Sequence, residues 1–317
     1  MSKVKNEHYV PRIYLENFSG KKKQVYVYDK SLDIQFKTGV KNIACEKAFY
    51  DFPNQDNEEQ IVEKMFSEIE GDFAKTLKNL LNLAHKKTNI PEDFKAVFSP
   101  YVVIQMLRTL DFRLQFRETM EKGMKALSYI FLKNNRPDLE GAKFNIKVKP
   151  EIESVLQAKF MFTKDTISEY ASVLANHVWV IGYSEKKMAF YTSDNPVVVI
   201  PHKESDIFSY AGIASEDVEI AYPLDPYHIL LMYHQSHYKK NPLLASFLKD
   251  RTILPLFHDN VTFYNSYQVT NSTRQIYSFD DDFNLAKKIC QDNPGYTNPN
   301  RSRVCIENPL LPQDFNK

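Results

Sequence analysis

The spacing of apolar residues changes twice along this chain, and the change limits the folds that the chain can adopt. Residues 24–28 and 34–38 are β-branched and aromatic runs on either side of a turn sequence, which predicts a hairpin. From about Asn57 the apolar residues recur every three or four positions, as they do in amphipathic helices. After His177 the chain returns to short apolar runs separated by turn residues. We therefore predict an α+β fold.

The predicted fold is a single domain in which a sheet built from N- and C-terminal strands packs against a central layer of long helices. Its N-terminal β segment covers residues 1–55, its helical layer 56–176 and its C-terminal α+β segment 177–317. Helices are expected at 57–85, at 91–134 with a kink at Pro100, at 150–174, at 259–278 and at 281–290. Further strands are expected at 48–52, 178–183, 188–192, 197–200, 219–224 and 227–233.

Charge and cysteine content narrow the class of protein. The 41 basic residues are balanced by 40 acidic ones, so any attraction to nucleic acid or to an anionic membrane would have to come from a local basic patch. Cys45, Cys290 and Cys305 have none of the paired spacings of a zinc site, which favours reduced thiols. The sequence has no signal peptide and no apolar stretch of membrane-spanning length. We expect a cytoplasmic protein without a membrane partner.

The motifs of common nucleotide-binding and hydrolytic enzymes are missing from the sequence. The chain has only 8 glycines and contains no phosphate-binding loop of the GxxxxGK or GxGxxG type. It also lacks the HExxH and GxSxG patterns. A P-loop or Rossmann nucleotide enzyme is thereby excluded.

Two polar segments far apart in the sequence are the candidates for a site. The first contains His8, Pro11 and Arg12, which place an imidazole and a guanidinium around a proline-stiffened turn. The second, residues 192–196, reads Thr-Ser-Asp-Asn-Pro and follows an apolar run. A proton acceptor and a fixed cation in one pocket would suit an active site, so we expect the two segments to meet.

The same residues belong to a longer pattern that resembles a widespread bacterial family known as domain of unknown function 4238. The combination of HYVP with SDNP is specific, and the likeness covers essentially the whole chain. It rests on His8-Tyr9-Val10-Pro11, Leu15, Phe18, Val25–Asp29, Phe49–Asp51, Glu63, Glu70, Gln105, Arg108-Thr109, Ser193–Pro196, Tyr222–Leu224, Asn265 and Ser272–Arg274. The family has no settled activity, so the resemblance implies a set of polar positions, a stand-alone bacterial cytoplasmic protein and, as a general impression, a role in defence against phage.

Each candidate residue has a structural and a functional interpretation. His8 is either a hydrogen-bonded plug or a functional group that acts as general base, metal ligand or phosphate contact. Arg12 either pairs with a carboxylate or clamps an anion. Gln105 and Arg108 lie three residues apart among apolar neighbours, so Arg108 needs an acidic partner, for which Glu70 and Asp194 are the candidates. Asp194 and Asn195 form either a turn before a strand, or a metal ligand beside a substrate-orienting amide.

The remaining histidines do not form a set with metal-ligand spacing. These are His85, His177, His202, His228, His234, His237 and His258, and the pair His234 and His237 is too short a motif to predict a site.

The segment from Glu7 to Pro11 also looks like the opening of HNH nucleases, in which a histidine activates water beside one metal ion. Such a site needs an asparagine and a second histidine further along the chain, often with CxxC zinc braces. Here Asn42 is the only nearby asparagine, the next histidine is His85, and the braces are missing. These departures count against that mechanism.

Two functions follow as hypotheses from these residues. The first is a hydrolase or nuclease-like enzyme acting on a phosphate-bearing substrate, either nucleic acid or nucleotide. In it His8, Asp194 and Glu70 are catalytic, with a divalent metal ion as an additional hypothesis, and the substrate is bound by Arg12, Gln105, Arg108 and Asn195. The alternative is a non-catalytic sensor or protein-interaction module in which the same polar residues form a buried structural network. Joint exposure of His8 and Asp194 in a cleft would favour the enzyme, and their burial with mutual pairing the module.

Overall fold

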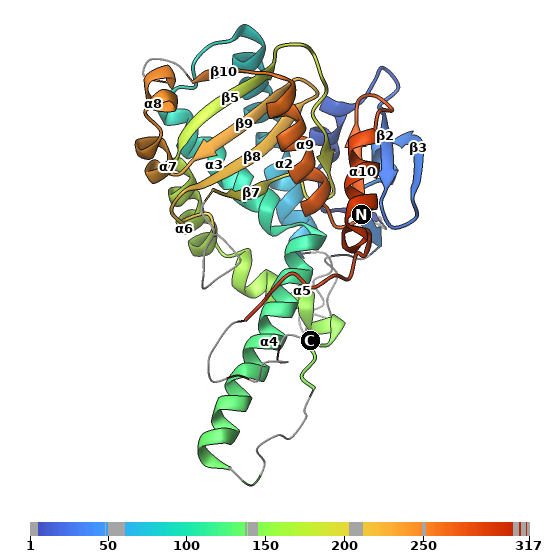
Figure 1. The fold of residues 1–317 in the computed structure, drawn as a ribbon, viewed down its shortest axis with the longest axis vertical. Helices are drawn as coiled ribbons and strands as arrows, with labels where there is room; N and C mark the ends of the chain where they lie inside the picture. The colour runs from blue at the N-terminus through green and yellow to red at the C-terminus, as the bar shows by residue number, and fades with distance from the viewer. Residues whose placement is uncertain are drawn as a thin grey trace.

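Helices cover both faces of a central sheet, a second sheet lies at its side, and one long helix, α4 (Leu110–Asn135), projects away from the body (Figure 1). This computed structural model describes residues 6–47, 49, 61–136, 138, 145–202, 212–248, 252–306, 311 and 315. Within these residues the chain is a mixture of helices and sheets of the α+β class, as predicted.

The central sheet has five strands in the order β10-β5-β9-β8-β7. All its neighbouring strands are antiparallel except β10 and β5, which run parallel. The strands are β5 (Val178–Ser184), β7 (Val198–Pro201), β8 (Val218–Asp225), β9 (His228–Tyr233) and β10 (Ile253–Leu256).

Both faces of this sheet are buried, because the apolar residues of its strands alternate between two cores. Trp179 and Ile181 pack in one core with helices α2 (Ile61–Lys86) and α3 (Glu92–Leu107). Val180, between them, packs in a second core with α9 (His258–Asn271). Figure 1 shows α9 in front of the sheet and α3 behind it.

The smaller sheet joins the two ends of the chain, which confirms that N- and C-terminal strands meet in one sheet. Its order is β3-β2-β11-β6, and every neighbouring pair is antiparallel. The strands are β2 (Gln24–Asp29), β3 (Ile34–Gly39), β6 (Thr192–Ser193) and β11 (Gln275–Ser278). Helix α10 (Asn284–Asp292) packs on this sheet through a third apolar cluster.

Other elements hold the N-terminal segment. β1 (Asn6–His8) pairs with β4 (Cys45–Lys47), and the short helix α1 (Arg12–Leu15) follows Pro11. Most of the strand expected at 48–52 lies outside the described residues.

Two of the long helices predicted from periodicity are each divided in the structure. The break in 91–134 falls at Arg108 and Thr109 rather than at Pro100, because the Thr109 hydroxyl accepts a hydrogen bond from the backbone N–H of Phe112 and starts a new helix. Likewise, the hydroxyl of Thr163 accepts from the N–H of Thr166. The helix expected at 150–174 is therefore α5 (Pro150–Met161) followed by α6 (Lys164–Ala175).

The C-terminal part also differs from the prediction. The helix expected at 259–278 ends at Asn271, and its last predicted residues form strand β11 instead. In the run 188–192 only Thr192 is in a strand. Two short helices were not predicted, α7 (Gln235–Lys240) and α8 (Pro242–Leu248).

Candidate functional site

The N-terminal motif is held against α3 by hydrogen bonds to its backbone. Arg108 donates from Nη2 to the carbonyl of His8, and Gln105 donates from Nε2 to the carbonyl of Tyr9 at 3.3 Å. Arg108 also pairs with Glu70, with 3.3 Å between Nη1 and Oε1. Glu70 is therefore the acidic partner that the sequence required, and Arg108 is 3 % exposed. Its guanidinium therefore has a structural role, because it joins the N-terminal motif to Glu70 on α2.

The His8 imidazole is held neutral by its surroundings. Its pKa is lowered to about 4, first by burial and then by the nearby guanidinium of Arg12, while a hydrogen bond with the backbone of Lys41 opposes the fall. Among the described residues, no hydrogen-bond partner reaches the buried Nε2 atom of His8. The Arg12 side chain is exposed at the start of α1. The side chain of Glu63 lies outside the described residues.

Asp194 is not part of this cluster but serves as a buried anchor for the segment between α9 and β11. Its carboxylate accepts backbone N–H groups from Thr273 at 2.8 Å, from Arg274 at 2.7 Å and from Gln275 at 2.8 Å. Burial raises the pKa of Asp194, while these three donors and the ammonium of Lys30 oppose the rise. With 2 % exposure, Asp194 has little surface to offer a substrate.

The rest of the second motif is held by the polar side of α9. The hydroxyl of Ser193 donates to Gln268 Oε1, and Gln268 Nε2 donates to the carbonyl of Pro196, each at 2.8 Å. The amide of Asn195 donates to the carbonyl of Asn271 at 3.2 Å. These bonds fix where β7 begins, and they leave Asn195 half-buried at the edge of a cavity.

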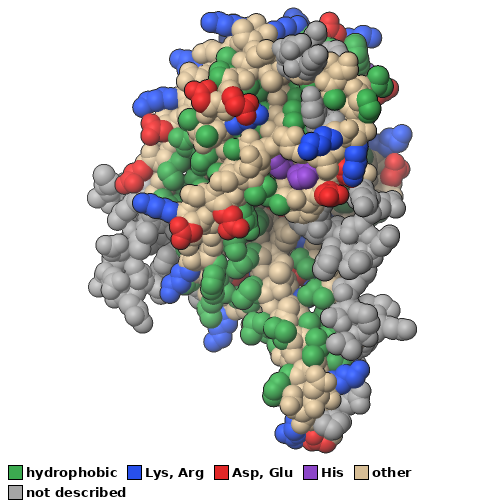
Figure 2. Space-filling view, turned by 90° about the vertical axis from the view of Figure 1, so that its left-hand side faces the viewer, with side chains coloured by type: hydrophobic (Ala, Val, Ile, Leu, Met, Phe, Trp, Pro, Cys, Tyr) green, Lys and Arg blue, Asp and Glu red, His purple; other side chains and the backbone are tan. Residues whose placement is uncertain are grey.

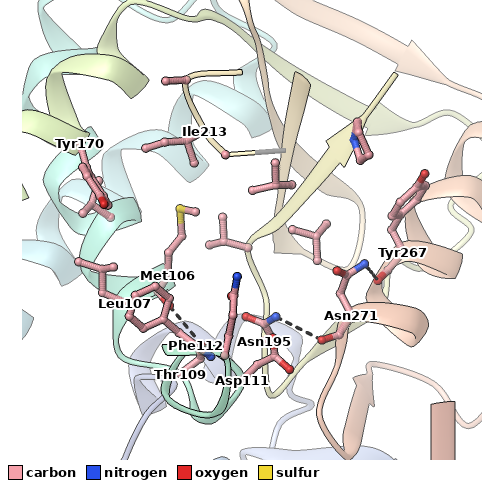
Figure 3. A pocket seen from close by; sticks show the side chains of 18 residues that line it. Met106, Leu107, Thr109, Asp111, Phe112, Tyr170, Asn195, Ile213, Tyr267 and Asn271 are labelled. Carbon is pink, nitrogen blue, oxygen red and sulfur yellow. Dashed lines mark hydrogen bonds between the residues drawn. The ribbon is translucent and has the colours of Figure 1, made fainter. Parts of the chain in front are cut away.

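That cavity, of about 540 Å³, is the main candidate site and lies between α3, α4, β7 and α9 (Figure 3). Its walls are mainly apolar, and Figure 3 shows Met106, Leu107 and Phe112 on the side opposite Tyr267 and Asn271. The lining residues are Val103, Met106, Leu107, Thr109, Asp111, Phe112, Gln115, Tyr170, Asn195, Val197, Val198, Val199, Pro201, Gly212, Ile213, Ala214, Tyr267 and Asn271. Of the residues singled out in the sequence as catalytic or substrate-binding, only Asn195 is among them.

The polar part of the cavity wall involves the C-terminal segment. Asp111, in the first turn of α4, accepts a hydrogen bond from Arg303 Nε at 2.8 Å and another from the hydroxyl of Thr273 at 3.2 Å. Arg301 donates to the carbonyls of Thr270 and Ser272, at the end of α9. The carboxylate of Asp111 is thus already neutralised, and no lysine, arginine or histidine is among the described residues that line the cavity.

A group of metal-ligating side chains that sequence spacing did not reveal lies elsewhere. His85, Asp225 and His228 each offer a donor atom, and these atoms lie within 4.8 Å of one another. His85 lies in the last turn of α2, whereas Asp225 and His228 flank the turn between β8 and β9. Histidine spacing alone did not indicate this cluster. The available signal in the sequence was Asp225 and His228, which lie three residues apart in a turn.

One face of the molecule carries scattered charges rather than a basic patch. Figure 2 shows Lys and Arg side chains dispersed among Asp and Glu, with hydrophobic side chains between them. The electrostatic attraction that nucleic acid requires is therefore not concentrated on this face. No helix in the described part of the chain is long and apolar enough to cross a membrane.

Comparison with known proteins agrees with the pattern of motifs. The model of a family described as a protein of unknown function (DUF4238) matches residues 6–282. This range includes both polar motifs and all the described residues that line the cavity, but not Arg303, which binds Asp111. No match was found among curated proteins or among solved structures. On the extent of the family match, the chain belongs to the DUF4238 family.

Proposed function

We propose that this protein is a non-catalytic sensor that binds a small molecule in the cavity between α3, α4, β7 and α9. The observation that supports this most is the cavity itself, of about 540 Å³ and mainly apolar, with a few polar side chains at one side. Pockets of this size and character are typical of small-molecule sites. The SDNP motif contributes Asn195 to its wall, whereas no residue of the HYVP motif is among the described residues that line it.

The lining favours an uncharged ligand with an apolar body and a hydrogen-bonding end. Met106, Leu107 and Val199 offer apolar contact. Figure 3 shows the side chains of Asn195 and Asn271 near each other, across the cavity from Met106 and Leu107. The nitrogens of both amides already donate within the protein, whereas their oxygens can accept, so a hydroxyl or amide N–H on the ligand would be suitable. A phosphate would find no cation among the described lining residues, and its desolvation would be uncompensated.

A fluorescence titration with the neutral apolar dye N-phenyl-1-naphthylamine tests the proposal. Val199→Trp fills the cavity from β7, and we expect dye affinity to fall at least tenfold, because the added ring occupies the binding volume. Val97→Trp is the matched control, since Val97 is 54 % exposed and does not line the cavity. Equal dye affinity in the wild type and both variants, at unchanged melting temperatures, would contradict the proposal.

The second candidate is the hydrolase or nuclease-like enzyme acting on a phosphate-bearing substrate. One observation favours it: His8 is neutral because of its lowered pKa, and its Nε2 atom and Gln105 Oε1 are without hydrogen-bond partners among the described residues. The exposed Arg12 is close enough to affect that pKa. Against this candidate, Asp194 is saturated by backbone donors and Arg108 is paired with Glu70.

Hydrolysis of bis(p-nitrophenyl) phosphate and cleavage of single-stranded DNA, with and without Mg²⁺, distinguish the two candidates. The sensor proposal expects no turnover above background for the wild type. Turnover that is lost in His8→Ala but kept in His258→Ala, with both variants folded, would establish the enzyme instead. A role in phage defence stays a prediction, which plaque counts on host cells carrying wild-type or His8→Ala protein would check.

A further inference from the structure

Two imidazoles meet one buried carboxylate at the end of the central sheet. His85 Nε2 lies 2.9 Å from Asp225 Oδ2, and His228 Nδ1 lies 3.0 Å from the same oxygen. The centroids of the two imidazole rings are 5.0 Å apart. Positions 85 and 225 are distant in sequence, so the fold alone brings the three side chains together.

The backbone orients the carboxylate. Asp225 Oδ1 accepts the backbone N–H groups of Tyr227 at 2.7 Å and of His228 at 2.9 Å, as is common for an aspartate that closes a turn between strands. Oδ2 is the oxygen that both imidazoles reach, and His228 Nδ1 also lies 2.9 Å from Oδ1. Hydrogen bonds of this kind are what hold a ligating carboxylate in one orientation in metal sites.

We propose that His85, Asp225 and His228 bind a divalent transition-metal ion such as Zn²⁺. Two imidazoles and a carboxylate are a ligand set that Zn²⁺ accepts, at about 2.0–2.2 Å from each donor atom. Donors at that distance from a tetrahedral ion lie about 3.3 Å from one another. The two N···O separations of 2.9 Å and 3.0 Å are close to this value, and all three donor atoms lie within 4.8 Å of one another. The His85 side chain is 57 % exposed, which gives an ion a path from solvent and leaves room for a water ligand.

A purely structural trio would behave differently. Without an ion, each imidazole must carry a proton on the nitrogen that faces Asp225, because a carboxylate oxygen can only accept. An ion would bind at those nitrogens, and each imidazole would then carry its proton on its other ring nitrogen. This proposal is independent of the proposed sensor function, since none of the three residues lines the cavity between α3, α4, β7 and α9.

Isothermal titration of EDTA-dialysed full-length protein with ZnCl₂, in two buffers of different ionisation enthalpy, tests the site. We expect one ion per chain in both buffers, and affinity at least tenfold weaker in His85→Ala and in His228→Ala. His258→Ala is the matched control, because His258 is also an exposed histidine beside an aspartate, and its affinity should equal that of the wild type. Titration with CoCl₂ should give visible absorption bands that His85→Ala loses.

Two results would overturn the proposal. One is wild-type protein that takes up no Zn²⁺ at millimolar concentration. The other is binding whose affinity is the same in the wild type and in folded His85→Ala. His85 is the more useful substitution, because its exposed side chain can be removed without opening the core, whereas loss of Asp225 also removes the turn contacts. Dye binding in the cavity should be unchanged in His85→Ala, so failure of this proposal and failure of the sensor proposal are distinguishable.

Discussion

In the folded protein the carboxylate of Asp194 accepts hydrogen bonds from three backbone N–H groups instead of water. We therefore expect its removal to lower the free energy of unfolding. Removing the carboxylate in Asp194→Ala leaves those three N–H groups without their acceptor and takes away a negative charge that favours the charged form of the buried Lys30. We expect the free energy of unfolding to fall by about 3–5 kcal/mol, the cost of breaking a buried charged network. Urea denaturation followed by circular dichroism measures it. Asp72→Ala, at an exposed ion pair, should change stability by less than about 0.5 kcal/mol.

His8 should make stability depend on pH between about 4 and 6.5. Its pKa is lowered from 6.5 to about 4 in the folded protein, so the unfolded chain binds a proton first as the pH falls. The free energy of unfolding therefore decreases as the pH drops from 7 towards 4. His8→Asn lacks this proton uptake, and its stability should decline less over the same range. His258→Asn, at an exposed histidine, should follow the wild type; a slope for His8→Asn equal to that of the wild type would contradict the pKa shift.

At the scale of elements, Thr109 decides where one helix ends and the next begins. Its hydroxyl accepts from the N–H of Phe112, and the turn that it starts carries Asp111 and Phe112 into the cavity wall. We expect Thr109→Ala to lower the free energy of unfolding by about 1 kcal/mol, the usual value of an N-cap, and to weaken dye binding. Thr119→Ala is the control, since Thr119 lies inside α4, where alanine is the better helix former. Equal stability of Thr109→Ala and the wild type would exclude the capping role.

Sequence periodicity was informative where local interactions decide the structure. The hairpin of β2 and β3 and the helix α2 were predicted within a few residues, because alternation and helical spacing are local signals. The breaks at Thr109 and Thr163 were missed, since an N-cap inside an apolar repeat does not interrupt the repeat. Strand β11 was missed for a different reason: the carboxylate of Asp194, some eighty residues earlier, binds the N–H groups that a continuing helix would need.

The candidate sites were harder to predict than the fold, because they assemble from distant segments. The sequence offered Glu70 and Asp194 as candidate partners of Arg108, since a buried guanidinium needs a nearby carboxylate, and the structure pairs Arg108 with Glu70. From the sequence we expected the first polar segment to share a pocket with Asp194. Instead, Asp194 binds the backbone at the start of β11, and of the predicted site residues only Asn195 lines the described cavity. Nothing local distinguishes Met106 or Val199 from ordinary core residues. The trio of His85, Asp225 and His228 likewise depends on how α2 meets the β8–β9 turn.

At the scale of the whole molecule, the C-terminal segment at residues 301–303 links α4 to α9. Arg303 pairs with Asp111 on α4, and Arg301 binds carbonyls at the end of α9. We expect Arg303→Ala to lower the melting temperature and the dye affinity together, because a buried carboxylate that loses its partner is destabilising. Arg136→Ala, at an exposed ion pair, is the control. Unchanged dye affinity in Arg303→Ala would show that Asp111 does not depend on the segment.

The family match ends at residue 282, twenty-one positions before Arg303. A recombinant fragment trimmed to the family boundary would therefore discard α10, which packs beneath β2 through Ala286 and Cys290, and would leave Asp111 without its arginine. Such a fragment should be prone to aggregation and to proteolysis. Expression trials and crystallisation of relatives should keep the chain beyond the position equivalent to Arg303.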